Sequence, residues 1–115
     1  MSWMLNVKGK GHIPAEQVQV GDLVQGFNVE KGKDVFRVVI RKNVRPFMSG
    51  YRINGHFVSP LTQVWGGGKT WMLAFKVSDA LFVDGAGENV CLELKSHDGE
   101  HNYWLAGPTP LLIRG

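Results

Sequence analysis

Hydrophobic and polar residues alternate along most of this chain, in short runs that polar or turn-forming residues interrupt. The longest run covers residues 35–44, and its hydrophobic positions fall on one side of an extended strand. No window of about a dozen residues keeps the hydrophobic spacing of an amphipathic helix without a Gly or Pro interrupting it. Only residues 15–18, which follow Pro14, resemble one turn of helix. The predicted strands cover residues 2–7, 22–28, 35–44, 48–53, 56–59, 71–75, 80–83, 90–94, 103–105 and 111–113, and the hydrophobic side of the longest one carries Phe36, Val38, Ile40 and Val44.

Turn-forming residues separate these runs. Asn54-Gly55 is the dipeptide most favourable for a two-residue hairpin, and it lies between two of the predicted strands. The chain has 15 Gly and 5 Pro among its 115 residues, a proportion that favours tight turns over long helices. Short strands at regular spacing predict an all-β fold, a sandwich or a barrel, formed by one domain over residues 1–115.

The chain also resembles itself. Asp22 and Asp79 are in register at a separation of 57 residues (79 − 22). Chance similarity within a chain rich in Gly and Val is one explanation. The other is a compact fold with pseudo-twofold symmetry, built from two similar halves that share one core because each is too small to close its own. The matched segments are 20–26 with 77–85, 34–38 with 89–94, and 51–55 with 103–107.

Composition and isolated motifs exclude several classes of protein. The chain is 43% hydrophobic and 20% charged, which is typical of a globular protein and not of a disordered one. The single cysteine, Cys91, excludes an intramolecular disulfide and a zinc site made of cysteines, and its hydrophobic neighbours indicate a packing role. No run approaches the roughly 20 hydrophobic residues of a membrane helix, and no signal peptide opens the chain, so we expect no membrane partner.

Two further motifs have a structural interpretation. Residues 66–70 read Gly-Gly-Gly-Lys-Thr and end like a phosphate-binding loop, but a strand rather than a helix follows them, so we expect a hairpin tip. His97 and His101 have the i, i+4 spacing of a zinc-binding helix, but Gly99 lies between them and no glutamate follows the first histidine. We therefore expect neither a metal site nor a cofactor.

Three groups of motifs follow one another in a fixed order. Residues 13–24 read Ile-Pro-Ala-Glu-Gln-Val-Gln-Val-Gly-Asp-Leu-Val, residues 59–62 read Ser-Pro-Leu-Thr with Trp-Met-Leu-Ala at 71–74, and residues 101–103 read His-Asn-Tyr before the last strand. Each motif alone is common, but their order and spacing resemble the hedgehog/intein (Hint) family over almost the whole chain. The resemblance implies a compact β fold with pseudo-twofold symmetry.

The resemblance also implies a reaction. Hint domains move an acyl group from a backbone nitrogen to the side chain of their first residue, a Cys or Ser, with the help of a histidine. If this chain is active, the resemblance assigns the nucleophile to Ser2, places Ser59 in the central box, and makes His101 the histidine that assists the second cleavage. A serine near a chain terminus with no catalytic role is the alternative interpretation of Ser2.

Two positions depart from the family pattern. The box histidine falls on Thr62, whose hydroxyl cannot act as a general base near neutral pH. The terminal His-Asn pair falls on Arg114-Gly115, and glycine has no side-chain amide with which to attack the backbone. We therefore expect a Hint-like fold whose catalytic positions are lost, with His101 making a structural hydrogen bond.

Basic and aromatic residues are the remaining candidates for binding. Arg37, Arg41 and Arg45 share one predicted face of the strand over residues 35–44, which is either a solvated face or a docking surface for an acidic partner. The net charge of +3 at pH 7 permits such a partner, including nucleic acid, although no interleaving of basic and aromatic residues favours base stacking. The chain has four tryptophans, too many to bury completely, and we predict that Trp65 and Trp71 contact another chain.

Three functions follow from these observations. The first is a non-catalytic structural or docking module of a larger assembly, such as a bacteriophage virion or tail, since Hint-like modules occur in phage genomes. The second is a self-cleaving domain that uses Ser2, Ser59 and His101, and the third is a basic β module that binds nucleic acid. We expect other protein chains as partners, further copies of this chain among them, and a cytoplasmic or virion-associated location.

Overall fold

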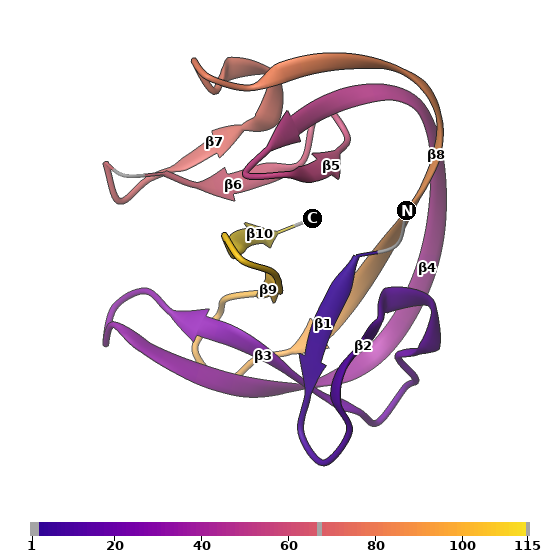
Figure 1. Cartoon of the computed structure of the whole chain (residues 1–115). Helices are drawn as coiled ribbons and strands as arrows, with labels where there is room; N and C mark the ends of the chain where they lie inside the picture. Colours follow the sequence, from indigo (N-terminus) through magenta and orange to yellow (C-terminus); the bar gives the residue numbers. More distant parts are fainter. Residues whose placement is uncertain (1–2, 67, 115) are drawn as a thin grey trace.

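The computed structural model describes residues 3–66 and 68–114, and nearly all of them lie in strands and turns (Figure 1). No helix in this part of the chain is long and hydrophobic enough to cross a membrane. The elements are β1 (Met4–Val7), β2 (Gly11–Pro14), the 3₁₀ turn η1 (Ala15–Gln17), β3 (Leu23–Asn28), β4 (Lys33–Ile53), β5 (His56–Val58), β6 (Gln63–Trp65), β7 (Trp71–Leu73), the 3₁₀ turn η2 (Ala74–Lys76), β8 (Leu81–Lys95), β9 (Asn102–Leu105) and β10 (Leu111–Arg114).

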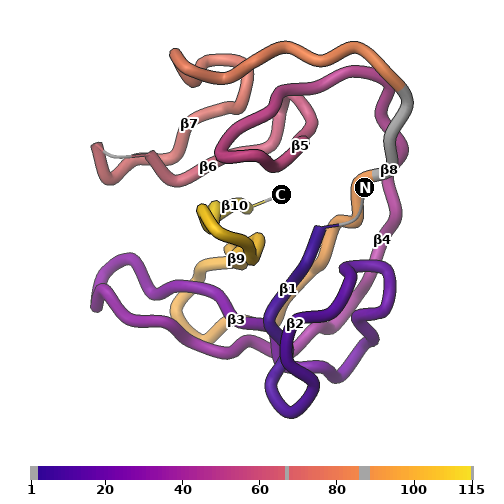
Figure 2. The backbone as a smooth tube through the Cα atoms, viewed as in Figure 1, coloured from indigo at the N-terminus to yellow at the C-terminus, as the bar shows by residue number. Residues whose placement is uncertain are grey.

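The strands form two antiparallel sheets. One has the order β2-β1-β3-β4-β5 with β8 paired along β4, and the other has the order β7-β6-β10-β9. The β4–β8 pairing extends from Val38 opposite Lys95 to Arg52 opposite Leu81, with two β-bulges that bend the ribbon. This curved ribbon runs from the part of the molecule that contains β1, β2 and β3 to the part that contains β5, β6 and β7 (Figures 1 and 2). The β9–β10 hairpin lies between these two parts, and β10 pairs with β6.

One structural unit occurs twice, a hairpin followed by a 3₁₀ turn. In β1–β2–η1 the amide of Ala15 donates to the carbonyl of Trp3 at 2.7 Å, and in β6–β7–η2 the amide of Ala74 donates to the carbonyl of Thr62 at 2.8 Å. The equivalent alanines, Ala15 and Ala74, are 59 residues apart (74 − 15), whereas the matched aspartates, Asp22 and Asp79, are 57 apart. The two separations differ because the segment between η2 and Asp79 is two residues shorter than the segment between η1 and Asp22. The predicted pseudo-twofold all-β fold is confirmed.

Both halves contribute to one continuous hydrophobic cluster. Its members come from the strands of both sheets, and no single unit closes a core of its own. The burial of these aliphatic side chains is the main stabilising contribution to the fold. The most buried of them are Leu5, Val7, Val18, Val24, Val39, Val58, Leu94, Leu105 and Ile113.

Two pairs of predicted strands are joined in the structure, and the strands β2 and β6 were not predicted. The segments 35–44 and 48–53 form one strand, β4, and 80–83 and 90–94 form one strand, β8. Pro46 has no amide hydrogen to donate to a neighbouring strand. It does not interrupt β4 because, between residues 41 and 49, this strand pairs only with β8, and its other edge requires no amide donor. The predicted hairpin at Asn54-Gly55 is confirmed, with φ angles of 51° and 80° that suit its two-residue turn.

The predicted hydrophobic side of β4 is also wrong. Phe36, Ile40 and Val44 are 42%, 53% and 51% exposed, whereas Arg37 is only 4% exposed. Arg37 is directed inward because its guanidinium finds acceptors on neighbouring elements, and the bulge at Val39/Arg41 then shifts the alternation of faces. Arg37 therefore cannot belong to an exposed docking face, while Arg41 and Arg45 are exposed.

Candidate functional site

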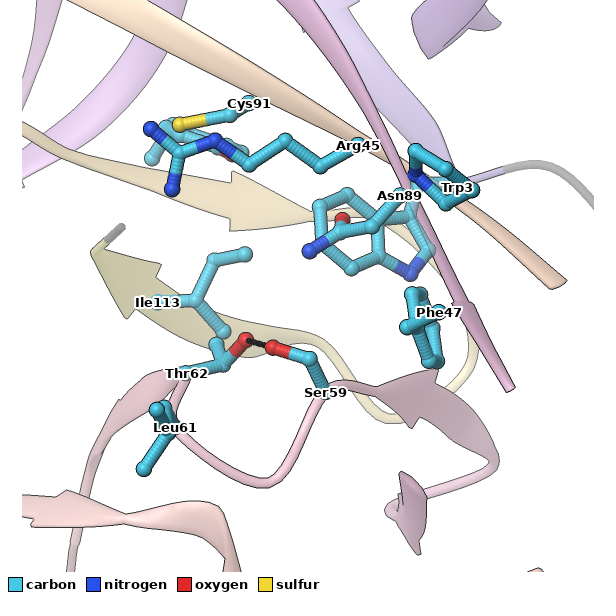
Figure 3. Close-up of a pocket in the computed structure, with 11 residues that line it drawn as sticks. Trp3, Arg45, Phe47, Ser59, Leu61, Thr62, Asn89, Cys91 and Ile113 are labelled. Atoms are coloured by element: carbon cyan, nitrogen blue, oxygen red, sulfur yellow. Dashed lines mark hydrogen bonds between the residues drawn. The ribbon is translucent and has the colours of Figure 1, made fainter. Parts of the chain in front are cut away.

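A cavity of about 240 Å³ lies where distant segments of the chain meet, and we call it the Ser59–Thr62 cavity (Figure 3). Its lining includes Trp3 at the start of the described chain, the box residues Ser59 and Thr62, and Ile113 from the last strand. The Hint resemblance assigns the reactive centre to these same three segments. The fold therefore brings together the parts of the chain that an acyl-shift site requires.

The box residues use their polar groups on each other. The hydroxyls of Ser59 and Thr62 share a hydrogen bond of 2.6 Å, drawn as a dashed line in Figure 3, and the amide of Thr62 donates to the carbonyl of Ser59 at 3.1 Å. Thr62 is 6% exposed, so its side chain fills the place where the resemblance expects an imidazole. No histidine lines the cavity in the described part of the chain. The hydroxyls consequently have no neighbouring base that could activate them.

The opposite wall contains polar groups that supply no base either. Tyr103 is buried and donates its hydroxyl to the carbonyl of Val90 at 3.3 Å. Burial, with the nearby Cys91 as a second cause, raises the pKa of Tyr103 above its ordinary value, so the phenol keeps its proton. The side-chain oxygen of Asn89 is buried without a hydrogen-bond partner among the described residues. This wall can accept a hydrogen bond from a further group, but it does not favour proton abstraction.

His101, another residue of the predicted catalytic set, does not line this cavity. His101 is exposed, and its Nδ1 donates to the carbonyl of Leu94 at 2.9 Å at the start of β9. It is not part of the cavity lining. Ser2 lies outside the described residues. Of the two described residues of this set, Ser59 lines the cavity and His101 does not.

Arg114 stands at the position of the penultimate histidine and is held by its own surroundings. Its guanidinium carbon lies 4.3 Å from the centroid of the Trp71 ring, and its Nη1 lies 3.4 Å from the Glu100 carboxylate. Its Nε also donates to Gln63. Trp71 and Trp65, which were predicted to contact another chain, are half-buried, and their ring centroids are 5.1 Å apart. Because Arg114 lies over the ring of Trp71, it covers part of that surface.

Sequence reasoning missed one polar cluster, the Arg37 network, which consists of Arg37, Asp98, Asn102 and the carbonyl of Phe27. Arg37 donates to the side chain of Asn102 and to Asp98, each at 2.8 Å, and to the carbonyl of Phe27 at 3.2 Å. The amide of Phe27 donates to Asn102 at 2.8 Å. A single arginine between inward-facing valines was the only signal for it in the sequence.

The charge balance of this network indicates a structural role. Although burial raises the pKa of Asp98, hydrogen bonds from Ser96 and Arg37 outweigh that effect and hold the pKa well below its usual range. The ionised pair therefore persists at all ordinary pH values. It joins β3, β4 and the turn before β9 and has no free acid or base to offer a substrate.

The remaining motifs have no catalytic arrangement. Among residues 3–66 and 68–114, no group of three His, Cys, Asp or Glu residues lies close enough to hold a metal ion. The amide of Gly66 donates to the carbonyl of Thr70 at 3.0 Å, so this glycine-rich segment closes the β6–β7 hairpin, as the sequence predicts. A strand follows it, not a helix whose amides could bind phosphate.

Comparisons with known proteins identify the fold. No family model matches the chain, and no curated protein matches it significantly. Among solved structures, the chain is similar to a bacterial intein-like domain from Clostridium thermocellum, with a TM-score of 0.77 and 14% sequence identity over 97% of this chain and 94% of that one. This chain therefore has the fold of an intein-like, or Hint-like, domain.

Proposed function

We propose that the chain is a non-catalytic Hint-like module that acts as a structural or docking component of a larger protein assembly. The observation that carries this proposal is the Ser59–Thr62 hydroxyl pair, which occupies the reactive centre of the fold without a base. Arg114, bound to Trp71 and Glu100, stands where a histidine would be needed for the second cleavage. Both ends of the expected reaction therefore lack an imidazole.

The absence of a base matters quantitatively. General acid–base catalysis by a positioned side chain contributes about 10²- to 10⁴-fold to a rate. A serine hydroxyl without an adjacent base is a weak nucleophile near neutral pH. A peptide bond next to such a hydroxyl would rearrange slowly, so the fold alone does not make the chain self-cleaving.

Exposed side chains support a docking role. Met48, Leu61 and Phe82 are 71%, 71% and 62% exposed, and Arg41 and Arg45 lie on the exposed part of β4. Large exposed hydrophobic residues and arginines are both typical of surfaces that another protein covers. The proposed assembly is a bacteriophage virion or tail, or another multi-chain particle in which this module repeats.

Self-cleavage is tested directly by intact mass. An inert tag is fused upstream of Ser2, and the mass of the purified fusion is followed for hours with and without a thiol. We expect no loss of the tag. Time-dependent loss that Ser2→Ala abolishes would overturn the non-catalytic proposal in favour of self-cleavage, and a parallel His101→Ala variant would show whether that histidine takes part.

Docking is tested by sedimentation and by binding at several salt concentrations. We expect concentration-dependent self-association or capture of a defined partner protein, reduced by a combined Arg41→Ala and Arg45→Ala variant. Binding to nucleic acid with a steep dependence on salt would instead favour the basic-module hypothesis. A strictly monomeric chain that captures no protein contradicts the docking proposal.

A further inference from the structure

A second hollow, which we call the Trp104 groove, shares no lining residue with the Ser59–Thr62 cavity. Its volume is about 410 Å³, within the range of small-molecule sites. Trp104 from β9 and Asp34 from β4 supply its aromatic and charged surfaces, and Gly107 and Pro110 from the β9–β10 connection complete one side. The groove thus combines an indole, a carboxylate, the imidazole of His12, the amide of Gln25 and small neutral residues.

A chain of hydrogen bonds holds the polar groups of the groove in place. Asn6 donates to Gln25 at 3.0 Å, and Gln25 donates to one oxygen of Asp34 at 3.0 Å. The indole N–H of Trp104 donates to the other oxygen of Asp34 at 2.9 Å. The ring of Phe27 packs edge-on against Trp104, with centroids 5.9 Å apart. The indole and the carboxylate are therefore oriented before any ligand arrives, which lowers the entropic cost of binding.

The charge of this site is not compensated within the described residues. Asp34 takes part in none of the ion pairs there, and both of its hydrogen bonds come from neutral donors. Each carboxylate oxygen has two lone pairs, so each can accept one more hydrogen bond. Among the described residues, His12 is the one basic residue in the lining, which contains no lysine or arginine, and this disfavours an anionic ligand. The chemistry that fits is a planar cation that stacks on indole and donates to a carboxylate.

The chain already contains this combination with its cation present. At Trp71 the guanidinium of Arg114 lies 4.3 Å from the ring centroid and pairs with Glu100. The Trp104 groove repeats the indole and the carboxylate but has no guanidinium of its own. An arginine side chain is the group that completes both arrangements, because its planar guanidinium stacks on an indole and presents a rigid fork of donors to a carboxylate, whereas a lysine ammonium is a compact point charge.

We propose that the Trp104 groove binds an arginine side chain of a partner protein. The guanidinium stacks on Trp104 and donates to the free lone pairs of Asp34. This inference relies on the proposed docking function for the identity of the partner, but the binding chemistry belongs to residues that the reactive centre does not use.

The test uses Nα-acetyl-arginine amide as the probe and the indole N–H signal of Trp104 as the NMR readout. We expect a saturable shift with a dissociation constant on the order of 1–10 mM, since one side chain offers little contact area. Nα-acetyl-citrulline amide, which has nearly the same shape without the charge, should bind about tenfold more weakly. Asp34→Asn should weaken binding of the arginine probe by about tenfold, because the amide can still accept from Trp104 but has lost the charge.

Controls make the result decisive. Asp84→Asn removes an exposed carboxylate elsewhere and should leave binding unchanged. A folded Asp34→Asn variant that binds the arginine probe as tightly as the wild type would overturn the inference. Equal binding of the citrulline and arginine probes would also overturn it. So would the lack of a saturable shift of the Trp104 signal when the probe is at about 10 mM and in roughly 50-fold excess over the protein. Saturable binding of methyl glucoside at Trp104 would also overturn it, in favour of a sugar site. None of these outcomes affects the tag-release assay, so the groove and the non-catalytic proposal fail separately.

Discussion

The Arg37 network and the Ser59–Thr62 cavity are two polar regions inside one small domain, and they differ in how their polar groups are satisfied. In the network, Arg37 reaches acceptors on three segments at 2.8–3.2 Å. In the cavity, two hydroxyls bond only to each other through their side chains, and the oxygen of Asn89 has no partner in the described chain. Both regions contain residues from the motifs that resemble the Hint family.

The difference separates the motif residues that build the fold from those that would perform chemistry. Asn102, from the His-Asn-Tyr motif, is fully buried and accepts from both Arg37 and the amide of Phe27. Thr62, in the box motif, keeps the turn but not the imidazole that catalysis requires. The chain thus has the fold of an intein-like domain at 14% sequence identity.

The largest effect is expected when Arg37 is replaced by methionine. The change removes the Arg37 hydrogen bonds to Asp98, Asn102 and Phe27, and we expect a loss of about 3 kcal/mol in the free energy of unfolding, since hydrogen bonds to charged groups contribute about 1.5–3 kcal/mol each. Urea unfolding followed by tryptophan fluorescence measures it. Arg41→Met, at an exposed position on the same strand, should cost well under 1 kcal/mol. Equal losses for the two variants would show that the Arg37 network contributes no more to the free energy of unfolding than an exposed arginine does.

Gly26→Ala should be the next most damaging change. A Cβ at this position would lie 2.5 Å from the carbonyl oxygen of Asn102 and would also collide with the guanidinium of Arg37. We expect about 2–3 kcal/mol of destabilisation from this overpacking. Gly85→Ala is the matched control, because nothing lies within 4 Å of a Cβ there. If both variants unfold at the wild-type urea concentration, the network is looser than its distances indicate.

The Asp98 carboxylate makes the stability depend on pH. Its folded pKa is held below the unfolded value of about 3.9, so the stabilisation is complete above about pH 5 and is lost as the pH falls toward the folded pKa. We expect the wild type to lose about 1–2 kcal/mol more than Asp98→Asn between pH 5 and pH 2.5. Chemical unfolding at the two pH values measures this difference. Parallel curves for the two proteins would contradict a charge contribution from Asp98.

The smallest effect is expected in the cavity. Thr62→Val removes one hydroxyl of the pair and keeps the shape, so we expect about 1 kcal/mol of destabilisation. Combined with Ser59→Ala in a double-mutant cycle, the two changes should show a coupling energy of about 0.5–1 kcal/mol. Additive effects would mean that the short hydroxyl contact contributes no net stability.

Local features of this fold could be predicted from the sequence, and features that depend on distant contacts could not. The Asn54-Gly55 hairpin and the 3₁₀ turn after Pro14 follow from neighbouring residues, and both are present. The unbroken course of β4 past Pro46 depends on β8, some 40 residues further along, as its partner. The short strands β2 and β6 were not predicted, because four and three residues carry too weak a pattern.

The candidate site shows the same division. The motif order placed Ser59 and Thr62 in one centre, and the cavity contains them together with Trp3. The inward course of Arg37 was missed because its partners, Asp98 and Asn102, lie 61 and 65 residues away in the chain. Alternation alone assigned the wrong face, since a buried arginine is favourable only when such acceptors are present.

We propose that the chain has the Hint fold without the acyl shift, and cleavage by hydroxylamine is the sharpest test of this proposal. An acyl shift at Ser2 would convert the preceding amide into an ester, which hydroxylamine cleaves far faster than an amide, so even a small ester population in a fusion with an upstream tag is detected by mass. We predict that the wild-type fusion and its Ser2→Ala variant release the tag equally slowly. Faster release from the wild type would contradict the account, because it would mean that Ser2 forms the ester without an imidazole beside the Ser59–Thr62 pair.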